Sequence, residues 1–595
     1  MFPNLRRMSV IYKPYRGRLI LSQLLLLISA VCSLATAALT QQLVNEGIAK
    51  QNVEVVLNTG FWMILLALIS AAGMIGAGLF AVLFSQGTAY VIRRLVYEKI
   101  QAFSFANYDR LRTGNLLVRL SADTQNVAQA VMYVLCMLLF APFMLIVAFG
   151  LALVSSPRLV WILLVVAVVV LGLMWLIVPR VFKAYAARQS RLDDLNNTMQ
   201  ENLAGIRVVK AFVREEYEKE KFGNRSDAMR VVAFQAAFLV ALIGPLLNGI
   251  TQIGRAAATW IGGAQVLAQT GLNTGELLAF TQYLQMVVVP LAMMAVVVPF
   301  VLRGETSAKR LYEVYDAKPV VEDSPDAVIL DPAEVKGHVV FDHVTFAFQR
   351  PDGAFEPPVL KDLDLEIEPG QRVGILGATG AGKSALVNLL PRFYDVTGGR
   401  ITIDGVDIRS LPQRNLRQIV GIALQEAVLF QGDLRFNLKF GAPDVDDEVM
   451  MAASRTADAA EFVDHLPQKY DAPVARRGYN FSGGQRQRLS MARTLTPLPR
   501  IVILDDSTSA LDVATESRVQ DGIPSFLTGA TIIYVAQRIS AVIDLDKIVL
   551  MEAGRIVEMG THDELLTRSS LYQDIYESQL GAGVKPHAAA EEVQR

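Results

Sequence analysis

VGILGATGAGKSALVNLL, residues 373–390, predicts a buried strand, a glycine-rich loop and a helix in direct succession. In such a loop, backbone N–H groups surround the phosphates of a nucleotide, and larger side chains than glycine's would block their approach. The pattern therefore predicts an α/β domain that binds a nucleotide. The residues expected around the phosphates are Gly377, Ala378, Thr379, Gly380, Ala381, Gly382, Lys383 and Ser384.

Three polar side chains are expected to bind phosphate and metal. Lys383 can reach the β- and γ-phosphates, and the hydroxyl of Ser384 can ligate Mg²⁺. Asp505 ends the apolar run IVILD, residues 501–505, and its carboxylate suits the same Mg²⁺ through a water molecule. The sequence therefore predicts Mg²⁺ as a cofactor beside a nucleoside triphosphate.

A second phosphate-binding surface is predicted within FSGGQRQRLSMARTL, residues 481–495. Ser482, Gly483 and Gly484 precede a helix there, as the glycine-rich loop does at 373–390. One triphosphate does not need two such surfaces. We therefore expect the second surface to serve a nucleotide held by another copy of the domain.

The first 300 residues contain apolar runs that predict a membrane domain, in a chain that is 52% hydrophobic. Runs of about 20 residues are long enough to cross the hydrocarbon layer. Two of the expected spans are more polar but still continuous. The six expected spans lie at or near 24–39, 62–84, 131–154, 160–178, 234–266 and 277–303.

Basic residues between the spans indicate the orientation. The segments 87–128 and 181–232 carry six and ten Lys or Arg residues, whereas the opposite connections carry only Lys50 and Arg158. We therefore expect a multi-pass protein of the cytoplasmic membrane, with its N-terminus and nucleotide-binding domain in the cytoplasm. The two basic segments are expected to be helices that leave the membrane, turn near 106–114 and 208–216, and contact that domain.

Composition divides the chain into four parts. Residues 1–316 are expected to form an α-helical membrane domain with an N-terminal elbow, and 317–335 a polar linker. Residues 336–580 are expected to form the α/β P-loop domain, and 581–595 a disordered tail. The net charge of −1 provides no field that would attract nucleic acid.

The chain resembles the half-transporters of the ATP-binding cassette (ABC) exporter family over nearly all of residues 1–580. Gly377–Ser384 matches the Walker A loop, and Asp505 matches the Walker B aspartate. Phe481–Gln485 matches the signature motif, with phenylalanine in place of the usual leucine. The resemblance implies six membrane helices of exporter type, ATP and Mg²⁺ as cofactors, and ATP hydrolysis coupled to transport across the lipid bilayer.

The resemblance also assigns roles to single residues. Gln425 matches the Q-loop glutamine that senses Mg²⁺, and Phe348 occupies the aromatic position that stacks on adenine. Asp512 ends the D-loop. In this family each ATP lies between the Walker motifs of one domain and the signature of its partner, here Ser482, Gly483, Gly484 and Gln485.

Three residues depart from the family pattern. Asp506 stands where the family usually has the glutamate that polarises the attacking water, and the lost methylene withdraws the carboxylate by roughly 1.5 Å. Gln537 stands at the switch histidine, and an amide cannot exchange a proton near neutral pH. Arg476 replaces a glutamate that many exporters place before the signature.

The intact signature and the two altered catalytic positions predict that ATP at this chain's Walker motifs is hydrolysed slowly or not at all. The signature is expected to complete a competent site on a second, different ABC half-transporter. We therefore expect a heterodimer that hydrolyses ATP mainly at the partner-based site. A homodimer, which would have two weak sites, is the alternative.

Polar residues within the spans are candidates for substrate contact, because they are costly in a membrane. Asn248, Gln252 and Arg255 recur on one face of the fifth span, and Gln282 lies in the sixth. Interhelical hydrogen bonding is the other explanation for the amides, and a partner carboxylate the other explanation for Arg255. We expect export of amphipathic or hydrophobic molecules that resemble drugs, lipids or peptides. An importer of this architecture and an ATP-gated channel or regulatory ATPase are the alternatives.

Overall fold

The chain forms two compact units in a computed structural model that describes residues 3–8, 11–138, 140–269, 272–350 and 353–580. The helical unit comprises the chain up to Gln101 together with Gly114–Ala317. The α/β unit comprises Ala102–Thr113 together with the chain from Lys318 onward. The predicted disordered tail, 581–595, lies outside the described residues.

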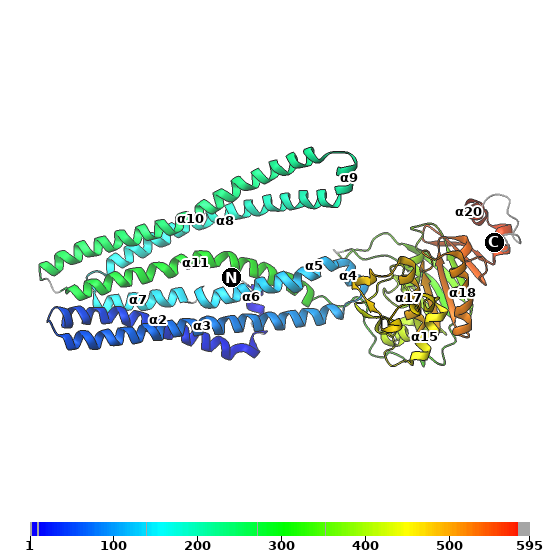
Figure 1. Cartoon of the computed structure of the whole chain (residues 1–595), viewed down its shortest axis with the longest axis horizontal. Helices are drawn as coiled ribbons and strands as arrows, with labels where there is room; N and C mark the ends of the chain where they lie inside the picture. The colour runs from blue at the N-terminus through cyan, green and yellow to red at the C-terminus, as the bar shows by residue number, and fades with distance from the viewer. Residues whose placement is uncertain (1–2, 9–10, 139, 270–271, 351–352, 581–595) are drawn as a thin grey trace. The chain divides into compact units, whose positions relative to one another are not determined.

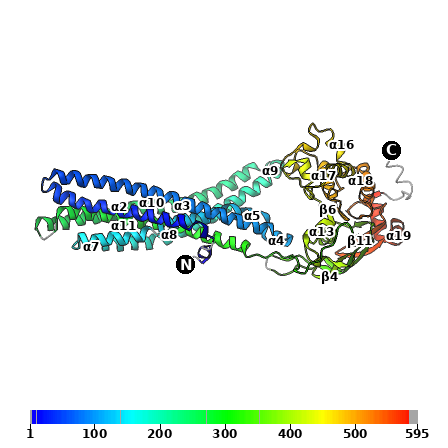
Figure 2. The same ribbon diagram turned by 90° about the horizontal axis from the view of Figure 1, so that it is seen from below.

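Long helices that lie side by side make up the helical unit (Figures 1 and 2). Five segments, counted over the described residues, are long and apolar enough to cross a membrane. The sixth predicted span falls within a further helix, α11, in which the side chains of 287–296 are outside the described part. The long helices are α2 (Arg16–Gln42), α3 (Val53–Gln101), α5 to α7 (Thr113–Ser155), α8 (Val160–Ala204), α10 (Glu215–Leu267) and α11 (Thr274–Tyr315).

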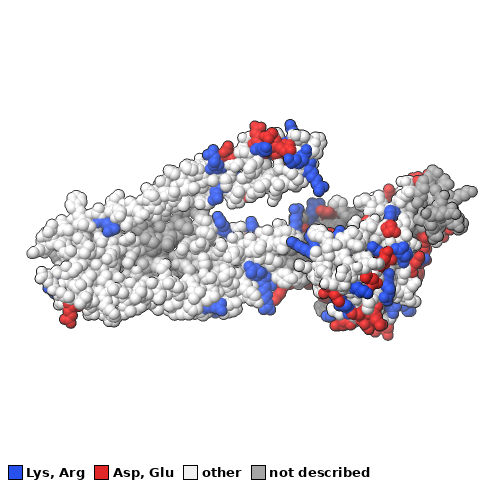
Figure 3. Space-filling model, viewed as in Figure 1, with Lys and Arg blue, Asp and Glu red and all other residues white. Residues whose placement is uncertain are grey.

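Shorter helical segments connect or interrupt the long ones. They are α1 (Pro3–Arg7), η2 (Lys13–Tyr15), η3 (Leu43–Ile48), η4 (Arg119–Asp123), η5 (Val134–Leu138) and α9 (Ile206–Ala211). Within Thr113–Ser155, α5 is Thr113–Val118, α6 is Thr124–Tyr133 and α7 is Phe140–Ser155. The helix α9 joins the ends of α8 and α10, where the charged residues of this hairpin gather (Figure 3).

Small residues let these helices pack closely, as is usual where apolar lipid surrounds a bundle. A Cβ atom at Gly254 would lie 2.7 Å from Val166, and one at Gly262 would lie 2.5 Å from Leu277. Large apolar side chains such as Trp175 face outward instead, with 82% of its surface exposed. The helical membrane domain expected from the sequence is thus confirmed.

A six-stranded, mostly parallel sheet is the centre of the α/β unit. Its strand order is β12-β11-β3-β10-β9-β6. A four-stranded antiparallel sheet has the order β2-β1-β4-β5, and β7 pairs with β8. The strands are β1 (Val339–Phe346), β2 (Leu360–Ile367), β3 (Arg372–Leu376), β4 (Gly398–Ile403), β5 (Val406–Asp407), β6 (Val420–Ala423), β7 (Gly432–Asp433), β8 (Pro473–Val474), β9 (Ile501–Asp505), β10 (Thr531–Ala536), β11 (Lys547–Glu552) and β12 (Arg555–Gly560).

The parallel sheet separates two hydrophobic cores. Along β9, Val502 and Leu504 belong to the core that contains residues of α15, α17 and α18, whereas Ile501 and Ile503 belong to the other. This alternation follows from the two-residue period of a strand whose two faces are both buried. The helices are α12 (Lys383–Leu389), α13 (Gln413–Ile419), α14 (Leu434–Leu438), α15 (Asp447–Thr456), α16 (Ala460–Val463), α17 (Gly483–Leu495), α18 (Val513–Phe526), α19 (His562–Arg568) and α20 (Ser570–Leu580), with short η6 (Ile408–Ser410), η7 (Lys469–Asp471), η8 (Arg476–Gly478) and η9 (Ile539–Ala541).

The helix α4 (Phe105–Leu111) packs within the α/β unit although its sequence lies among the membrane helices. The ring of Phe105 stacks on that of Phe393 with 4.3 Å between centroids. The hydroxyl of Tyr394 donates to Asp109 Oδ2 at 2.7 Å, and Asn107 Nδ2 donates to the carbonyl of Lys318 at 2.9 Å. All but the last residue of the predicted turn at 106–114 therefore belongs to the second unit.

Candidate nucleotide site

The glycine-rich loop follows β3 and requires glycine at two positions for different reasons. A Cβ atom at Gly377 would lie 2.3 Å from the carbonyl oxygen of Met551, so a larger residue would displace β11. Gly382 has φ of +99° directly before α12, a left-handed conformation that favours glycine. The loop can therefore present its backbone N–H groups to phosphates. These donors suit the triphosphate of ATP, the cofactor expected from the sequence.

Lys383 begins α12, directly after the phosphate-binding loop. The Lys383 ammonium donates to the carbonyls of Gly377 at 2.6 Å and Ala378 at 3.0 Å. Burial lowers its pKa, against the raising effect of Asp506 and Asp505. The negative charge of bound phosphates would stabilise the ammonium, which fits the phosphate-binding role expected for Lys383.

The metal side of the site consists of Ser384 and Asp505. Ser384 Oγ donates to Asp505 Oδ1 at 3.1 Å, so two oxygen ligands of the kind that Mg²⁺ prefers lie together. Burial is the largest effect on the Asp505 carboxyl and raises its pKa, and the neighbouring Asp506 acts in the same direction. A bound Mg²⁺ would neutralise this charge and would stabilise the negative charge of nucleotide phosphates.

Asp506 is the centre of a hydrogen-bond network directly after β9. Its Oδ2 accepts from Gln425 Nε2 at 3.2 Å and from Gln537 Nε2 at 3.2 Å. Gln537 Oε1 in turn accepts from Thr379 Oγ1 at 3.4 Å. The strand order explains this convergence, because β6, β9 and β10 are neighbours and these residues follow their carboxyl ends.

One cavity of about 270 Å³ brings together residues predicted from five separate motifs. Sequence reasoning had not included Val359, Ala385, Val535 or Ala536, which also line it. Their apolar side chains have no functional group that would mark them as binding residues in the sequence. The predicted residues in its lining are Phe348, Thr379, Gly380, Gly382, Lys383, Ser384, Gln425, Asp505, Asp506 and Gln537.

The signature motif lies outside the lining of that cavity. Ser482 caps α17: its hydroxyl accepts from the Gln485 N–H at 3.2 Å, and Gln485 Oε1 accepts from the Ser482 N–H at 2.9 Å. Ser482 and Gly483 are exposed. A Cβ atom at Gly483 would meet no heavy atom within 4 Å, whereas one at Gly484 would lie 3.1 Å from Ala510. The motif thus presents an open surface that this chain's own nucleotide cavity does not use.

Asp512 has a local structural role in the chain. Its carboxylate caps α18 by accepting from the N–H and the hydroxyl of Thr515, each at 2.9 Å. The backbone hydrogen bond is the first cause of its lowered pKa. Gln487, which the sequence had not singled out, holds the same segment by accepting from the Ala510 N–H at 3.0 Å.

The substrate candidates separate into two environments. Gln282 Nε2 donates to Thr40 Oγ1 at 3.3 Å, which is the interhelical alternative for an amide in a span. Asn248, Gln252 and Arg255 are exposed on α10, and Arg255 donates to Gln252 at 3.4 Å. Substrate contact remains a prediction for this exposed face.

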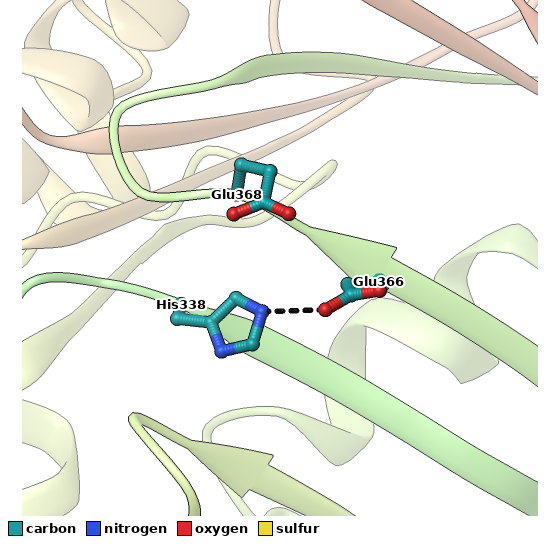
Figure 4. A group of neighbouring side chains, drawn as sticks. All are labelled: His338, Glu366 and Glu368. Atoms are coloured by element: carbon teal, nitrogen blue, oxygen red, sulfur yellow. Dashed lines mark hydrogen bonds and ion pairs between the residues drawn. The ribbon is translucent and has the colours of Figure 1, made fainter.

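A further group of possible metal ligands lies on the antiparallel sheet (Figure 4). His338 Nε2 and Glu366 Oε1 are 2.9 Å apart, and Glu368 points toward them. Glu366 and Glu368 are exposed. A hydrogen bond between neighbouring strand segments accounts for this contact. The group shares no residue with the described lining of the nucleotide cavity.

Comparison with known proteins agrees with this geometry. Residues 19–291 match the model of the ABC transporter transmembrane region, and 360–509 match the ABC transporter model. The uncharacterized ABC transporter ATP-binding protein YfiB of Bacillus subtilis is 32% identical over 571 residues, which cover 96% of this chain and 97% of that protein. The ATP-dependent lipid A-core flippase of Syntrophus aciditrophicus is 29% identical and covers 99% of this chain and 96% of its own.

A solved structure of a bacterial Atm1-family ABC exporter with ATP bound has the same fold. Its TM-score is 0.77 at 26% identity, and the match covers 96% of this chain and 99% of that one. The family as a whole binds and hydrolyses ATP. With both of its domains matched, this chain belongs to the ABC transporter family and has the fold of an ABC exporter.

Proposed function

We propose that the protein exports amphipathic or hydrophobic molecules across the cytoplasmic membrane as one half of a heterodimeric ABC transporter. Its Walker motifs form a site that holds ATP and cleaves it slowly. Its signature completes the competent site on a different half-transporter. A lipid-like substrate is one of the classes this includes, and the similarity to a lipid A-core flippase supports it.

The geometry of Asp506 carries this proposal. Both amides that flank the carboxylate donate to one of its oxygens, so these groups restrain it within the protein network. Gln537 cannot act as a proton carrier in place of a histidine. A glutamate would extend about 1.5 Å further toward an attacking water. The residues around this ATP therefore favour retention over hydrolysis.

Coupling to the membrane helices is proposed to run through α4 and α9. Tyr394 contacts Asp109 of α4 on one side, and its ring lies 5.4 Å from that of Phe348, the expected adenine contact, on the other. At α9 and the following turn, Val208, Phe212 and Val213 are 60%, 74% and 79% exposed. Exposed apolar groups of this kind suit contact with the partner's nucleotide-binding domain. Two bound ATP molecules would close the domain pair, and both contacts would pass that movement to the membrane helices.

Tyr394→Phe should reduce transport about 5- to 30-fold while the basal ATPase stays within about twofold. The substitution removes a hydrogen bond to the charged Asp109, whose loss changes an equilibrium by about that factor, and keeps the aromatic packing. Tyr534→Phe is the matched control, because its hydroxyl has no hydrogen-bond partner among the described residues. ATPase and dye-uptake assays on the same vesicles give both quantities. Equal loss of transport in the two variants would contradict a coupling role.

Inverted membrane vesicles that contain this chain and its partner provide the test of the function. Vectorial accumulation of a hydrophobic dye that depends on ATP and fails with a non-hydrolysable analogue is expected. A channel would only equilibrate the dye, and an importer would fail to concentrate it inside inverted vesicles. Either result would refute export.

A further inference from the structure

The last described helix, α20, lies against the core of the α/β unit. Tyr572 is fully buried there, and its hydroxyl lies 2.7 Å from His562 Nδ1. Tyr576 is 5% exposed on the same face. These contacts fix the helix, so a side chain from its last turn can hold a neighbouring loop in place.

Gln579, in that last turn, binds the main chain after β10 at two points. Its Nε2 donates to the carbonyl of Gln537 at 2.9 Å, and its Oε1 accepts from the N–H of Ile539 at 2.8 Å. A single amide thus uses its donor and its acceptor on both sides of Arg538. Because both partners are backbone groups, the contact fixes the path of the segment 537–539 and does not depend on the side chain at 537.

The side chain of Gln537 borders a cavity. This cavity of about 520 Å³ lies between the phosphate-binding loop and α20, and its lining includes Gln537, Ile575 and Gln579. Side chains therefore do not fill the space beside Gln537. Ile539 is buried in the core that also contains Tyr572 and Tyr576, so packing holds the segment at this end, and the hydrogen bonds of Gln579 hold it beside the cavity.

The held segment carries the side chain that contacts Asp506. Gln537 is 3.2 Å from Asp506 and 3.4 Å from Thr379 of the phosphate-binding loop. A chain of contacts thus leads from α20 through the backbone of 537 to the nucleotide site. A displacement of about 1 Å at such a site can change a rate about 100-fold.

We propose that Gln579 is a positioning residue that sets the geometry of the switch position, so that α20 controls how Gln537 meets Asp506 and the bound nucleotide. This role rests on the proposed function only in that it concerns the same nucleotide site. The position of the segment can be measured without nucleotide turnover.

Hydrogen exchange on the purified full chain tests the proposal. Gln579→Met keeps the length of the side chain and removes both hydrogen bonds, so exchange in residues 537–541 should accelerate about 5- to 30-fold. Gln579→Glu keeps the acceptor for Ile539 and should give an intermediate rate. Gln573→Met is the matched control: Gln573 lies on the same helix and donates to Leu566, away from the segment, so its loss should leave 537–541 unchanged.

ATPase kinetics in the double variant Asp506→Glu with Gln537→His distinguish a positioning role of Gln579 from a merely structural one. There, Gln579→Met should lower kcat about fivefold or more and change KM for ATP by less than about twofold. Unchanged exchange at 537–541, or the same acceleration in Gln573→Met, would overturn the role of Gln579. Failure of that background to hydrolyse ATP would count against the proposed function and leave the exchange result standing.

Discussion

Gly483→Asp in this chain should lower ATP turnover of the transporter complex by about 100-fold or more. Gly483 is exposed in the signature, and a Cβ atom there would meet no heavy atom within 4 Å, so the variant should fold normally. The new carboxylate would lie where the partner's nucleotide phosphates are expected. Loss of a group that stabilises such charge costs about 100- to 1000-fold, and a repelling charge should cost no less.

Neutral variants at the same position provide the controls. Gly483→Asn has nearly the shape of aspartate without its charge, and Gly483→Ala adds only a methyl group. Both should retain substantially more activity than Gly483→Asp when ATPase is measured on the complex. Turnover within about threefold of the parent in Gly483→Asp would mean that this signature does not serve the hydrolysing site.

Asp506→Glu combined with Gln537→His should raise hydrolysis at this chain's own Walker site by about 100-fold. The first change extends the carboxylate by about 1.5 Å toward the attacking water, and the second supplies a group that can transfer a proton near neutral pH. Gln425 still lies beside position 506 and should continue to orient the carboxylate.

The single variants and Asp506→Asn test the assignment. Each single change should give a smaller gain than the double variant, and the two effects should not be additive, because the side chains at the two positions are in contact at 3.2 Å. Asp506→Asn should give none. ATPase should be measured with the partner's catalytic glutamate changed to glutamine, so that only this site contributes. No gain in the double variant would show that these two residues do not limit the rate.

Local patterns were enough to predict the phosphate-binding loop, the strand before it and the apolar run that ends at Asp505. The run 373–390 combines a buried strand, glycine and lysine within 18 residues, and the structure places Lys383 and Ser384 in one cavity with Asp505. The division into a membrane half and a nucleotide-binding half could also be predicted, because hydropathy differs between the two halves over long stretches.

Long-range contacts could not be predicted in the same way. The shared oxygen of Asp506 depends on the order of β6, β9 and β10, which no short pattern specifies. Gln579 and Tyr394 belong to no motif that a sequence pattern could identify. A glutamine in a surface helix and a tyrosine after a helix are both common. The boundaries 1–316 and 336–580 assign 102–113 to the membrane domain. A contact near 106–114 was expected, but the structure goes further and groups 102–113 with the second unit.

The identity of the nucleotide bound to this chain after turnover tests the central claim most directly. The complex would be incubated with Mg²⁺ and a radiolabelled photoreactive ATP analogue, separated rapidly from free nucleotide and cross-linked, and the label on each chain would be identified as the di- or triphosphate. We predict triphosphate on this chain and diphosphate on its partner. Diphosphate on this chain in the same proportion as on the partner would contradict a site that retains ATP.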